Sequence, residues 1–361
     1  MITISLCMIV KDEEDTLERC LEGVGECVDE IIIVDTGSKD NTKAIAGKYT
    51  DKLYDFPWIK DFSAARNYGF SKATKEYCMW MDADDILSAE NAQALLELKQ
   101  ELTTETDIVM MPYETAFDET GAPVFSYYRE RIVKNQENFR FKGRVHEAIA
   151  LSGKIFYADI PVRHQKTKEG DHLRNLNIYE EMEREGENFS PRDYYYYGRE
   201  LLTHRRYEKG IRILTAFLKT PDGWIENKID ATRQLSYCYE QTGRKEEALK
   251  ALLEGLAYDV PRGETCCALG RHFLNQGQYE QAVFWYQQAL YSKKNKTTGA
   301  FVEEDCYGFL PAISLCICYD RMGDQKKAEI YNELAGRYKP ESPYYLQNKE
   351  YFKKKENSGA N

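Results

Sequence analysis

The sequence lacks the patterns that would mark it as a disulfide-rich, metal-finger or membrane-spanning protein. Its 361 residues include ten cysteines, but no two stand at C-x-x-C spacing. We therefore expect these cysteines to be reduced core residues. No uninterrupted apolar run reaches about 18 residues, the length that a transmembrane helix needs. The first ten residues enter an apolar strand pattern without a basic leader, so we expect a cytoplasmic protein with no transmembrane segment.

An excess of positive charge is also absent. Lysine and arginine number 49 against 60 aspartate and glutamate residues, which gives a net charge of −11 and a pI near 5.2. This balance argues against nucleic acid or an anionic membrane as the main partner. The length is enough for two or three domains, each with its own core.

The first half of the chain alternates strand and helix patterns. Residues 3–10 and 30–34 are apolar runs typical of strands covered on both faces, and the second of them ends at Asp35 and breaks at Gly37. Helical spacing follows each run, over residues 16–24 and 41–49. This alternation predicts a Rossmann-like, mostly parallel sheet, which binds ligands beyond the carboxyl ends of its strands.

Three acids follow the apolar run Tyr77 to Met81 directly. Asp82 and Asp84 are separated by one small residue at the predicted end of a strand, and Asp85 comes next. Carboxylate oxygens in this spacing can bind one hard cation, Mg²⁺ or Mn²⁺, which would in turn hold a diphosphate. The alternative is that Asp84 and Asp85 cap the helix expected near Ser88.

An arginine precedes this strand on a predicted helix. Asp61 or Ser63 can cap a helix with apolar and small residues on one face, which would leave Arg66 on the side toward the crevice. A solvated surface arginine is the alternative, because arginine is rarely buried.

From about residue 175 the pattern becomes helical without strands. Small residues recur at roughly the 34-residue period of tetratricopeptide repeats, at Gly198, Ser236, Gly270 and Cys316. Glycines at 243, 277 and 323 mark the turns between paired helices, and an insertion at 295–304 is expected to be a loop. The tail resembles tetratricopeptide repeats, which bind polypeptides, cap a neighbouring domain or form a homodimer.

Four stretches together resemble the family 2 glycosyltransferases. They are residues 5–14, 30–42, 61–67 and 81–85, in the family's order. The resemblance implies an inverting enzyme of the GT-A fold that uses a nucleotide-sugar donor. With the helical tail, the chain looks like the subgroup that contains the peptide S-glycosyltransferases of bacteriocin biosynthesis.

The resemblance also implies a donor site. Asp35 would accept a hydrogen bond from the nucleobase, expected to be the uracil of a UDP-sugar. Asp84 and Asp82 would hold Mg²⁺ or Mn²⁺, and His164, which ends a predicted strand over 155–164, would complete the metal shell. A structural histidine is the alternative. Asp12, where relatives often have Asn, receives no specific contact. The residues placed at the nucleotide-sugar are Val10, Asp35, Gly37, Arg66, Asp82 and Ala83.

An inverting transfer also needs a carboxylate that takes the proton of the acceptor. Glu147 is our candidate, because the family has an acidic motif in this region, here residues 143–147. Period-two alternation over 139–149 places Arg140 and His146 on one face and Glu147 on the other. The alternative is a glutamate at a helix N-terminus that interacts with the helix dipole.

We therefore expect residues 1–174 to be a GT-A catalytic domain and residues 175–361 a repeat domain. The predicted function is metal-dependent transfer of a sugar from a nucleotide donor to a peptide, protein or saccharide acceptor. Two alternatives remain open. One is a repeat-based scaffold that binds a nucleotide without transfer, and the other is a glycosyltransferase that builds cell-surface polysaccharide.

Overall fold

The computed structural model describes residues 1–167, 171–294 and 301–359. Its contacts divide the chain into two compact units, Met1–Tyr196 and Tyr197–Asn361. Most of the predicted insertion at 295–304 lies outside the described residues. The functional boundary that we placed after residue 174 stays a prediction, and helix α5 begins at that point, at Arg174.

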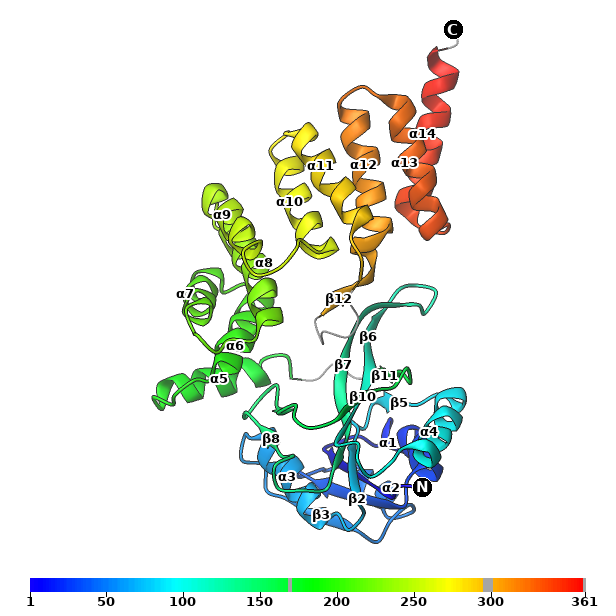
Figure 1. Cartoon of the computed structure of the whole chain (residues 1–361), viewed down its shortest axis with the longest axis vertical. Coiled ribbons are helices and arrows are strands. Elements are labelled where there is room, and N and C mark those ends of the chain that lie inside the picture. Colours follow the sequence, from blue (N-terminus) through cyan, green and yellow to red (C-terminus); the bar gives the residue numbers. More distant parts are fainter. Residues whose placement is uncertain (168–170, 295–300, 360–361) are drawn as a thin grey trace. The chain divides into compact units, whose positions relative to one another are not determined.

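The first unit carries the strands of a mixed sheet and the helices that cover it (Figure 1). Its strands are β1 (Ile4–Val10), β2 (Glu30–Asp35), β3 (Leu53–Asp55), β4 (Tyr77–Trp80), β5 (Asp85–Ile86), β6 (Ile108–Phe117), β7 (Pro123–Lys134), β8 (Phe141–Lys142), β9 (Ala148–Ile149), β10 (Ile155–Tyr157) and β11 (Val162–His164). Its helices are α1 (Leu17–Val24), the short 3-10 helix η1 (Gly25–Cys27), α2 (Thr42–Ala46), α3 (Phe62–Lys72), α4 (Ala89–Glu101) and α5 (Arg174–Arg184), and α6 (Pro191–Thr203) spans the division between the units.

The main sheet has the strand order β3-β2-β1-β4-β7-β6-β11-β5, with β10 also paired to β6. Strands β3, β2, β1 and β4 run parallel, as the alternating pattern predicted. The hairpin of β6 and β7 then inserts β7 antiparallel between β4 and β6. The carboxyl ends of β1, β2 and β4 therefore share one edge, to which the turn after β4 brings its acids.

Both faces of the sheet are covered, which explains why its first strands read as continuous apolar runs. Leu6 and Met8 pack into the cluster that contains side chains of α1 and α4. Cys7, between them, faces the opposite cluster, which includes Phe70 of α3. Alternate side chains of β1 thus pack into two cores, one on each face of the sheet, and neither face is exposed to solvent at this strand.

Two local expectations are wrong. The strand predicted over 155–164 is two strands, β10 and β11, separated at residues 158–161, where Pro161 lacks a backbone donor for a ladder. Helix α4 is capped by Ser88, which accepts a hydrogen bond from the Asn91 N–H, and not by Asp84 or Asp85. The acids are therefore free of the capping role.

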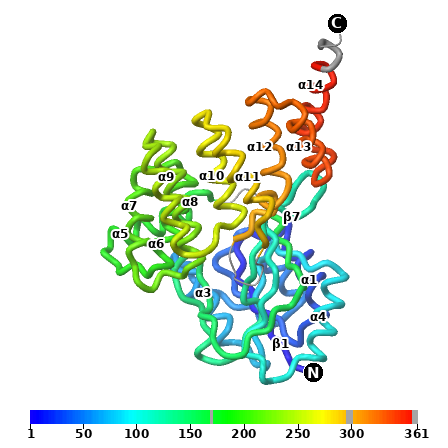
Figure 2. Tube along the Cα trace, turned by 45° about the horizontal axis from the view of Figure 1, so that its top comes forward, coloured from blue at the N-terminus to red at the C-terminus, as the bar shows by residue number. Residues whose placement is uncertain are grey.

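The second unit is a stack of helix pairs (Figure 2). Its elements are α7 (Tyr207–Leu218), α8 (Ile225–Gln241), α9 (Lys245–Gly255), α10 (Gly263–Asn275), α11 (Tyr279–Tyr291), β12 (Val302–Glu303), the 3-10 helix η3 (Glu304–Tyr307), α12 (Phe309–Arg321), α13 (Gln325–Tyr338) and α14 (Pro343–Gly359). Within the described ranges, no helix is both long and apolar enough to cross a bilayer.

Glycines explain how these helices pair. The turns at Gly243, Gly277 and Gly323 have φ of 78°, 72° and 82°, a conformation that favours glycine after a helix. At Gly270, a β-carbon would lie only 2.8 Å from the ring of Tyr286 on the partner helix. The predicted small residues therefore permit close helix packing, as the repeat pattern required.

Candidate active site

Helix α3 places an arginine in the interior of the first unit. Asp61 caps the helix by accepting a hydrogen bond from the Ala64 N–H at 2.9 Å, as the sequence suggested. Arg66 follows little more than one turn later, with a side chain only 7% exposed. Its guanidinium lies 4.8 Å from the ring centroid of Trp80 in the neighbouring strand β4. The alternative of a solvated surface arginine is therefore wrong.

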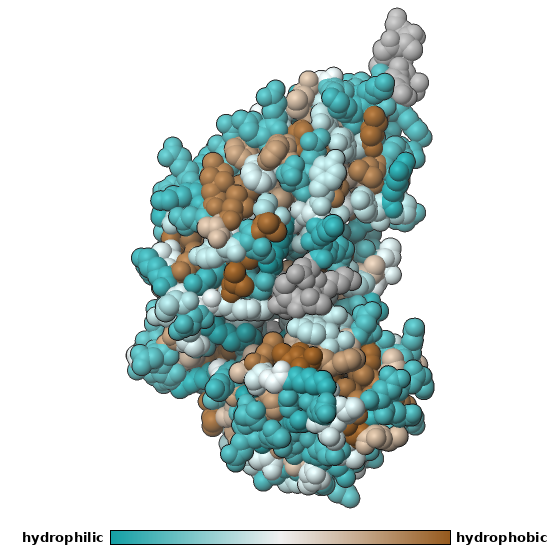
Figure 3. Space-filling model, viewed as in Figure 1, coloured by the Kyte–Doolittle hydropathy of each residue, from teal (hydrophilic) through white to brown (hydrophobic). Residues whose placement is uncertain are grey.

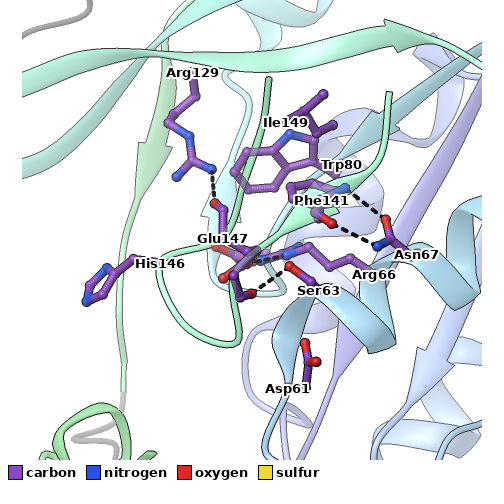
Figure 4. A network of polar contacts seen from close by, with 12 residues as sticks. Asp61, Ser63, Arg66, Asn67, Trp80, Arg129, Phe141, His146, Glu147 and Ile149 are labelled. Carbon is purple, nitrogen blue, oxygen red and sulfur yellow. Dashed lines mark hydrogen bonds and ion pairs between the residues drawn. The ribbon is translucent and has the colours of Figure 1, made fainter. Parts of the chain in front are cut away.

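Arg66 joins two carboxylates that are far apart in sequence (Figure 4). Its Nε donates to Glu147 Oε1 at 2.6 Å, and one terminal nitrogen donates to Asp82 Oδ1 at 2.6 Å. Burial opposes charge on Asp82, but the guanidinium of Arg66 outweighs it and lowers the pKa of Asp82. Burial likewise opposes charge on Arg66, and the two carboxylates outweigh it and raise its pKa. The three groups form one charged network.

The segment that carries Glu147 is fastened to α3. Asn67 donates to the Phe141 carbonyl at 3.0 Å and accepts from the Phe141 N–H at 2.9 Å. Ser63 donates to the Gly143 carbonyl at 2.6 Å (Figure 4). Side chains from three positions on one helix, including Arg66, thus fix both the backbone and the carboxylate of the segment.

Glu147 lies after a sharp turn and before strand β9. Gly143 and His146 have φ of 100° and 50°, so the chain reverses tightly just before the glutamate. Glu147 is 8% exposed, and its carbonyl accepts a hydrogen bond from Arg129 at 3.1 Å. Because β9 and not a helix follows, the helix-dipole alternative is wrong. Burial alternates along residues 139–149 as predicted, with Glu147 among the buried residues, but the turn means that the segment is not continuously extended.

The acids at the end of β4 form a tight turn. The Asp85 N–H donates to the Asp82 carbonyl at 3.0 Å, and Ala83 between them is buried. Asp82, Asp85 and His164 each bring one ligand atom within 4.8 Å of the others. This group holds Asp85 where the sequence led us to expect Asp84, and Asp84 lies beside the same histidine. Carboxylates with an imidazole suit Mn²⁺, and carboxylates alone suit Mg²⁺, so the residue types around the turn fit the expected cation.

His164 ends strand β11 beside these acids, as the sequence predicted. Its Nδ1 lies 3.2 Å from Asp84 Oδ1 and 3.1 Å from Asp85 Oδ1. Burial lowers the pKa of His164, but the hydrogen bonds to Asp84 and Asp85 outweigh it and raise the pKa to about 10. The two carboxylates beside the ring thus favour the protonated, positively charged form of His164.

The nucleotide end of the predicted site lies at β1 and β2. Asp35 is 1% exposed, and its Oδ2 accepts from the N–H groups of Gly37 and Ser38, each at 3.0 Å. Its Oδ1 is buried without a hydrogen-bond partner among the described residues. Gly37 has φ of 107°, and a β-carbon there would meet nothing within 4 Å, so the loop faces open space. The carbonyl of Val10 is taken by Thr36.

Sequence reasoning missed the arginines of β7. Arg129 and Arg131 place their guanidinium carbons 4.6 and 4.0 Å from the ring centroid of Trp80. With Arg66, three guanidinium groups surround one indole, and the Trp80 Nε1–H donates to the Glu130 carbonyl at 2.6 Å. The two arginines are two positions apart in a strand pattern, a signal that places them on one face. Only the pairing of β7 with β4 shows which ring they meet.

Comparison with known proteins assigns families to parts of both units. Residues 5–156 match the family described as glycosyl transferase family 2, and residues 263–296, helices α10 and α11, match a tetratricopeptide repeat. The chain carries a family 2 glycosyltransferase domain. Asp35, Arg66, the acidic turn and Glu147 all lie inside that domain, and His164 lies just beyond the matched residues.

Curated relatives share parts of the chain. A TPR repeat-containing protein of Synechococcus elongatus is 40% identical over 154 residues, which are 41% of this chain and 36% of the relative. The SPbeta prophage-derived glycosyltransferase SunS of Bacillus subtilis is 31% identical over 219 residues, 55% of this chain and 49% of SunS.

The lipopolysaccharide core biosynthesis glycosyltransferase LpsC of Rhizobium meliloti is 27% identical over 167 residues, 43% of this chain and 59% of LpsC. The matched part of the chain covers about half or less of the Synechococcus elongatus protein and of SunS. Among solved structures, MamA covers 46% of this chain and 82% of its own, with a TM-score of 0.37 at 15% identity.

Proposed function

We propose that this protein is an inverting, metal-dependent glycosyltransferase that moves a sugar from a UDP-sugar to an acceptor side chain. The observation that carries the proposal is the bridge that Arg66 makes between Glu147 and Asp82. One carboxylate belongs to the turn expected at the donor diphosphate, and the other belongs to the segment expected at the acceptor. Arg66 thus holds the carboxylate expected at the donor next to the carboxylate expected at the acceptor.

Asp35 is the proposed contact for the nucleobase. Its unpartnered Oδ1 is a buried acceptor, and a buried polar atom without a partner costs free energy. An N–H of uracil would satisfy it, because a carboxylate can accept further hydrogen bonds. Gly37 and the backbone of Val10 would lie beside the nucleotide, with Arg66 and Ala83 toward the diphosphate.

Asp82, Asp84 and His164 are the proposed holders of Mg²⁺ or Mn²⁺. A bound divalent cation supplies positive charge that stabilises a departing diphosphate. The side chains of Asp82 and Asp84 are 31% and 17% exposed, so both reach the solvent from which a cation and donor arrive. Arg66 keeps Asp82 oriented from the protein side.

Glu147 is the proposed general base. Arg66 occupies its Oε1, and among the described residues no hydrogen bond reaches its Oε2. That oxygen would take the proton from an acceptor hydroxyl or thiol as the new bond to the sugar forms. Arg129 holds the backbone carbonyl of Glu147, and Arg66 holds one oxygen of its side chain.

The repeat unit is the proposed acceptor-binding part, because stacked repeats present extended concave surfaces. Exposed apolar side chains interrupt its charged surface (Figure 3). Val260 is 76% exposed, Phe284 53% and Ile330 57%. Such side chains suit contact with a polypeptide, whether an acceptor or a second copy. We favour a peptide or protein acceptor over a saccharide on this ground.

Replacement of Glu147 tests the proposal. Glu147→Gln keeps the size of the side chain but removes the base, so transfer should fall by about 10² to 10⁴. Turnover with donor and acceptor supplied is the measurement. Glu137→Gln, an exposed glutamate of the same region, is the matched control and should leave turnover unchanged. Turnover of Glu147→Gln within a few-fold of wild type would remove Glu147 from the base role.

A further inference from the structure

The three acids after β4 differ sharply in burial and in what surrounds them. The side chain of Asp85 is fully buried, whereas those of Asp82 and Asp84 are 31% and 17% exposed. A donor diphosphate and its cation reach the protein from solvent. Exposure alone therefore separates the two accessible acids from the third.

Both oxygens of Asp85 are already occupied by donors. Oδ2 accepts from the Arg131 guanidinium at 3.0 Å and from the Asp82 N–H at 3.0 Å. Oδ1 accepts from the Tyr113 hydroxyl at 2.9 Å and lies 3.1 Å from His164 Nδ1. A carboxylate with this many donors gains little from a cation, because binding one would displace hydrogen bonds already made.

Burial of the charged Arg131 guanidinium costs considerable free energy. Its side chain is 0% exposed, it lies between the rings of Trp80 and Tyr113 at 4.0 and 4.2 Å, and its Nε and one terminal nitrogen have no hydrogen-bond partner among the described residues. A buried ion pair is weak evidence for stability, because well-packed apolar residues often serve as well. The role of Arg131 is better explained by its contact with Asp85, which it holds in place.

We propose that Asp85 is a positioning residue and not a metal ligand: anchored by Arg131 and Tyr113, it fixes the His164 ring and the Asp82 backbone. This inference rests on the proposed function. Nδ1 of His164 lies 3.1 Å from Asp85 and 3.2 Å from Asp84, which leaves Nε2 as the nitrogen that can bind a cation. Metal-binding histidines are commonly oriented in this way by a carboxylate on the other ring nitrogen.

Removal of one hydroxyl tests the anchor without touching any proposed ligand. Tyr113→Phe should weaken Mn²⁺ binding by about 10-fold, the lower end of the usual cost of losing such a partner. The measurement is Mn²⁺ affinity by electron paramagnetic resonance on the full chain without donor, beside a thermal melt. Tyr128→Phe, on strand β7 of the same sheet, is the matched control and should bind Mn²⁺ like wild type. Unchanged affinity in a folded Tyr113→Phe protein overturns the proposal.

A second pair of variants separates a ligand from a positioning residue. Asp84→Asn should abolish measurable Mn²⁺ binding, whereas Asp85→Asn should retain it with about 10- to 100-fold lower affinity. Equal loss in both variants would make Asp85 a ligand and overturn the inference. If wild type binds no Mn²⁺, the metal part of the proposed function fails. If wild type binds and Tyr113→Phe binds equally well, only this inference fails.

Discussion

Arg66 illustrates, at the scale of a single residue, how a buried charge is retained. Its burial is offset by two carboxylates at 2.6 Å and by the faces of Trp80 and Phe141. Loss of either carboxylate would leave the guanidinium partly unpaired, which is costly in a dry interior. The same contacts that stabilise the arginine therefore hold Asp82 and Glu147 in place.

Glu30 is another buried charged residue, and its role is structural. At the start of β2, it accepts hydrogen bonds from the Thr74 N–H at 2.8 Å, from the Thr74 hydroxyl, from Ser5 and from Lys52. Burial raises its pKa, but these donors outweigh burial and lower the pKa from 4.5 to about 2. Stability from this group is complete above pH 4.5 and disappears as the pH falls toward 2.

Glu30→Gln should therefore make the free energy of unfolding depend less on pH in the acid range. The shift corresponds to about 3 kcal/mol at neutral pH. We expect the variant to lose a comparable part of its free energy of unfolding at pH 7, and to lose less than wild type between pH 4.5 and 2. Denaturant melts across this range provide the measurement, with exposed Glu119→Gln as the control. Parallel pH curves for Glu30→Gln and wild type would contradict the assignment.

At the scale of secondary-structure elements, α3 is the part that assembles the site. Ser63, Arg66 and Asn67 all reach the segment from 139 to 149, which has only the two-residue strands β8 and β9 of its own. Such short strands contribute little by themselves. The helix therefore supplies the order that the segment lacks.

Asn67→Ala should loosen this segment without unfolding the domain. It removes two hydrogen bonds to Phe141, each worth about 0.5–1.5 kcal/mol. We expect a loss of about 1–3 kcal/mol in stability and a larger proportional fall in transfer, because Glu147 becomes less ordered. Thermal melts and turnover measured on one preparation check this. Ser71→Ala, which removes only a local contact to Tyr68 on the same helix, is the control. Equal turnover in the two variants would contradict a positioning role for α3.

The sequence predicted the elements better than the contacts. Apolar runs revealed β1, β2 and β4 because both faces of the sheet are covered, and Asp61 was identified as a candidate cap. The break between β10 and β11 was missed although Pro161, which has no backbone donor for a ladder, stands inside the predicted strand. The carboxyl-end rule gathered Asp35 and Asp82 at one edge, but no rule of periodicity could pair Arg66 with Glu147, which are 81 positions apart. Arg131 and Tyr113 were missed because their partner, Asp85, is reached only through the hairpin of β6 and β7.

At the scale of the whole molecule, the chain combines two kinds of stability. The first unit depends on long-range pairing of strands, and the second on packing between neighbouring helices at positions such as Gly270. The family 2 glycosyltransferase match, residues 5–156, lies in the first unit, and the tetratricopeptide match, residues 263–296, lies in the second.

The proposed function requires that the acids of the first unit hold a cation for a nucleotide-sugar donor. The most direct test is release of nucleotide from a panel of nucleotide sugars, measured on the full chain with Mn²⁺, with EDTA, and with Mn²⁺ restored after EDTA. We predict slow release from a UDP-sugar that EDTA abolishes and Mn²⁺ restores. Absence of metal-dependent release from every donor in the panel would contradict the account and would favour a nucleotide-binding scaffold.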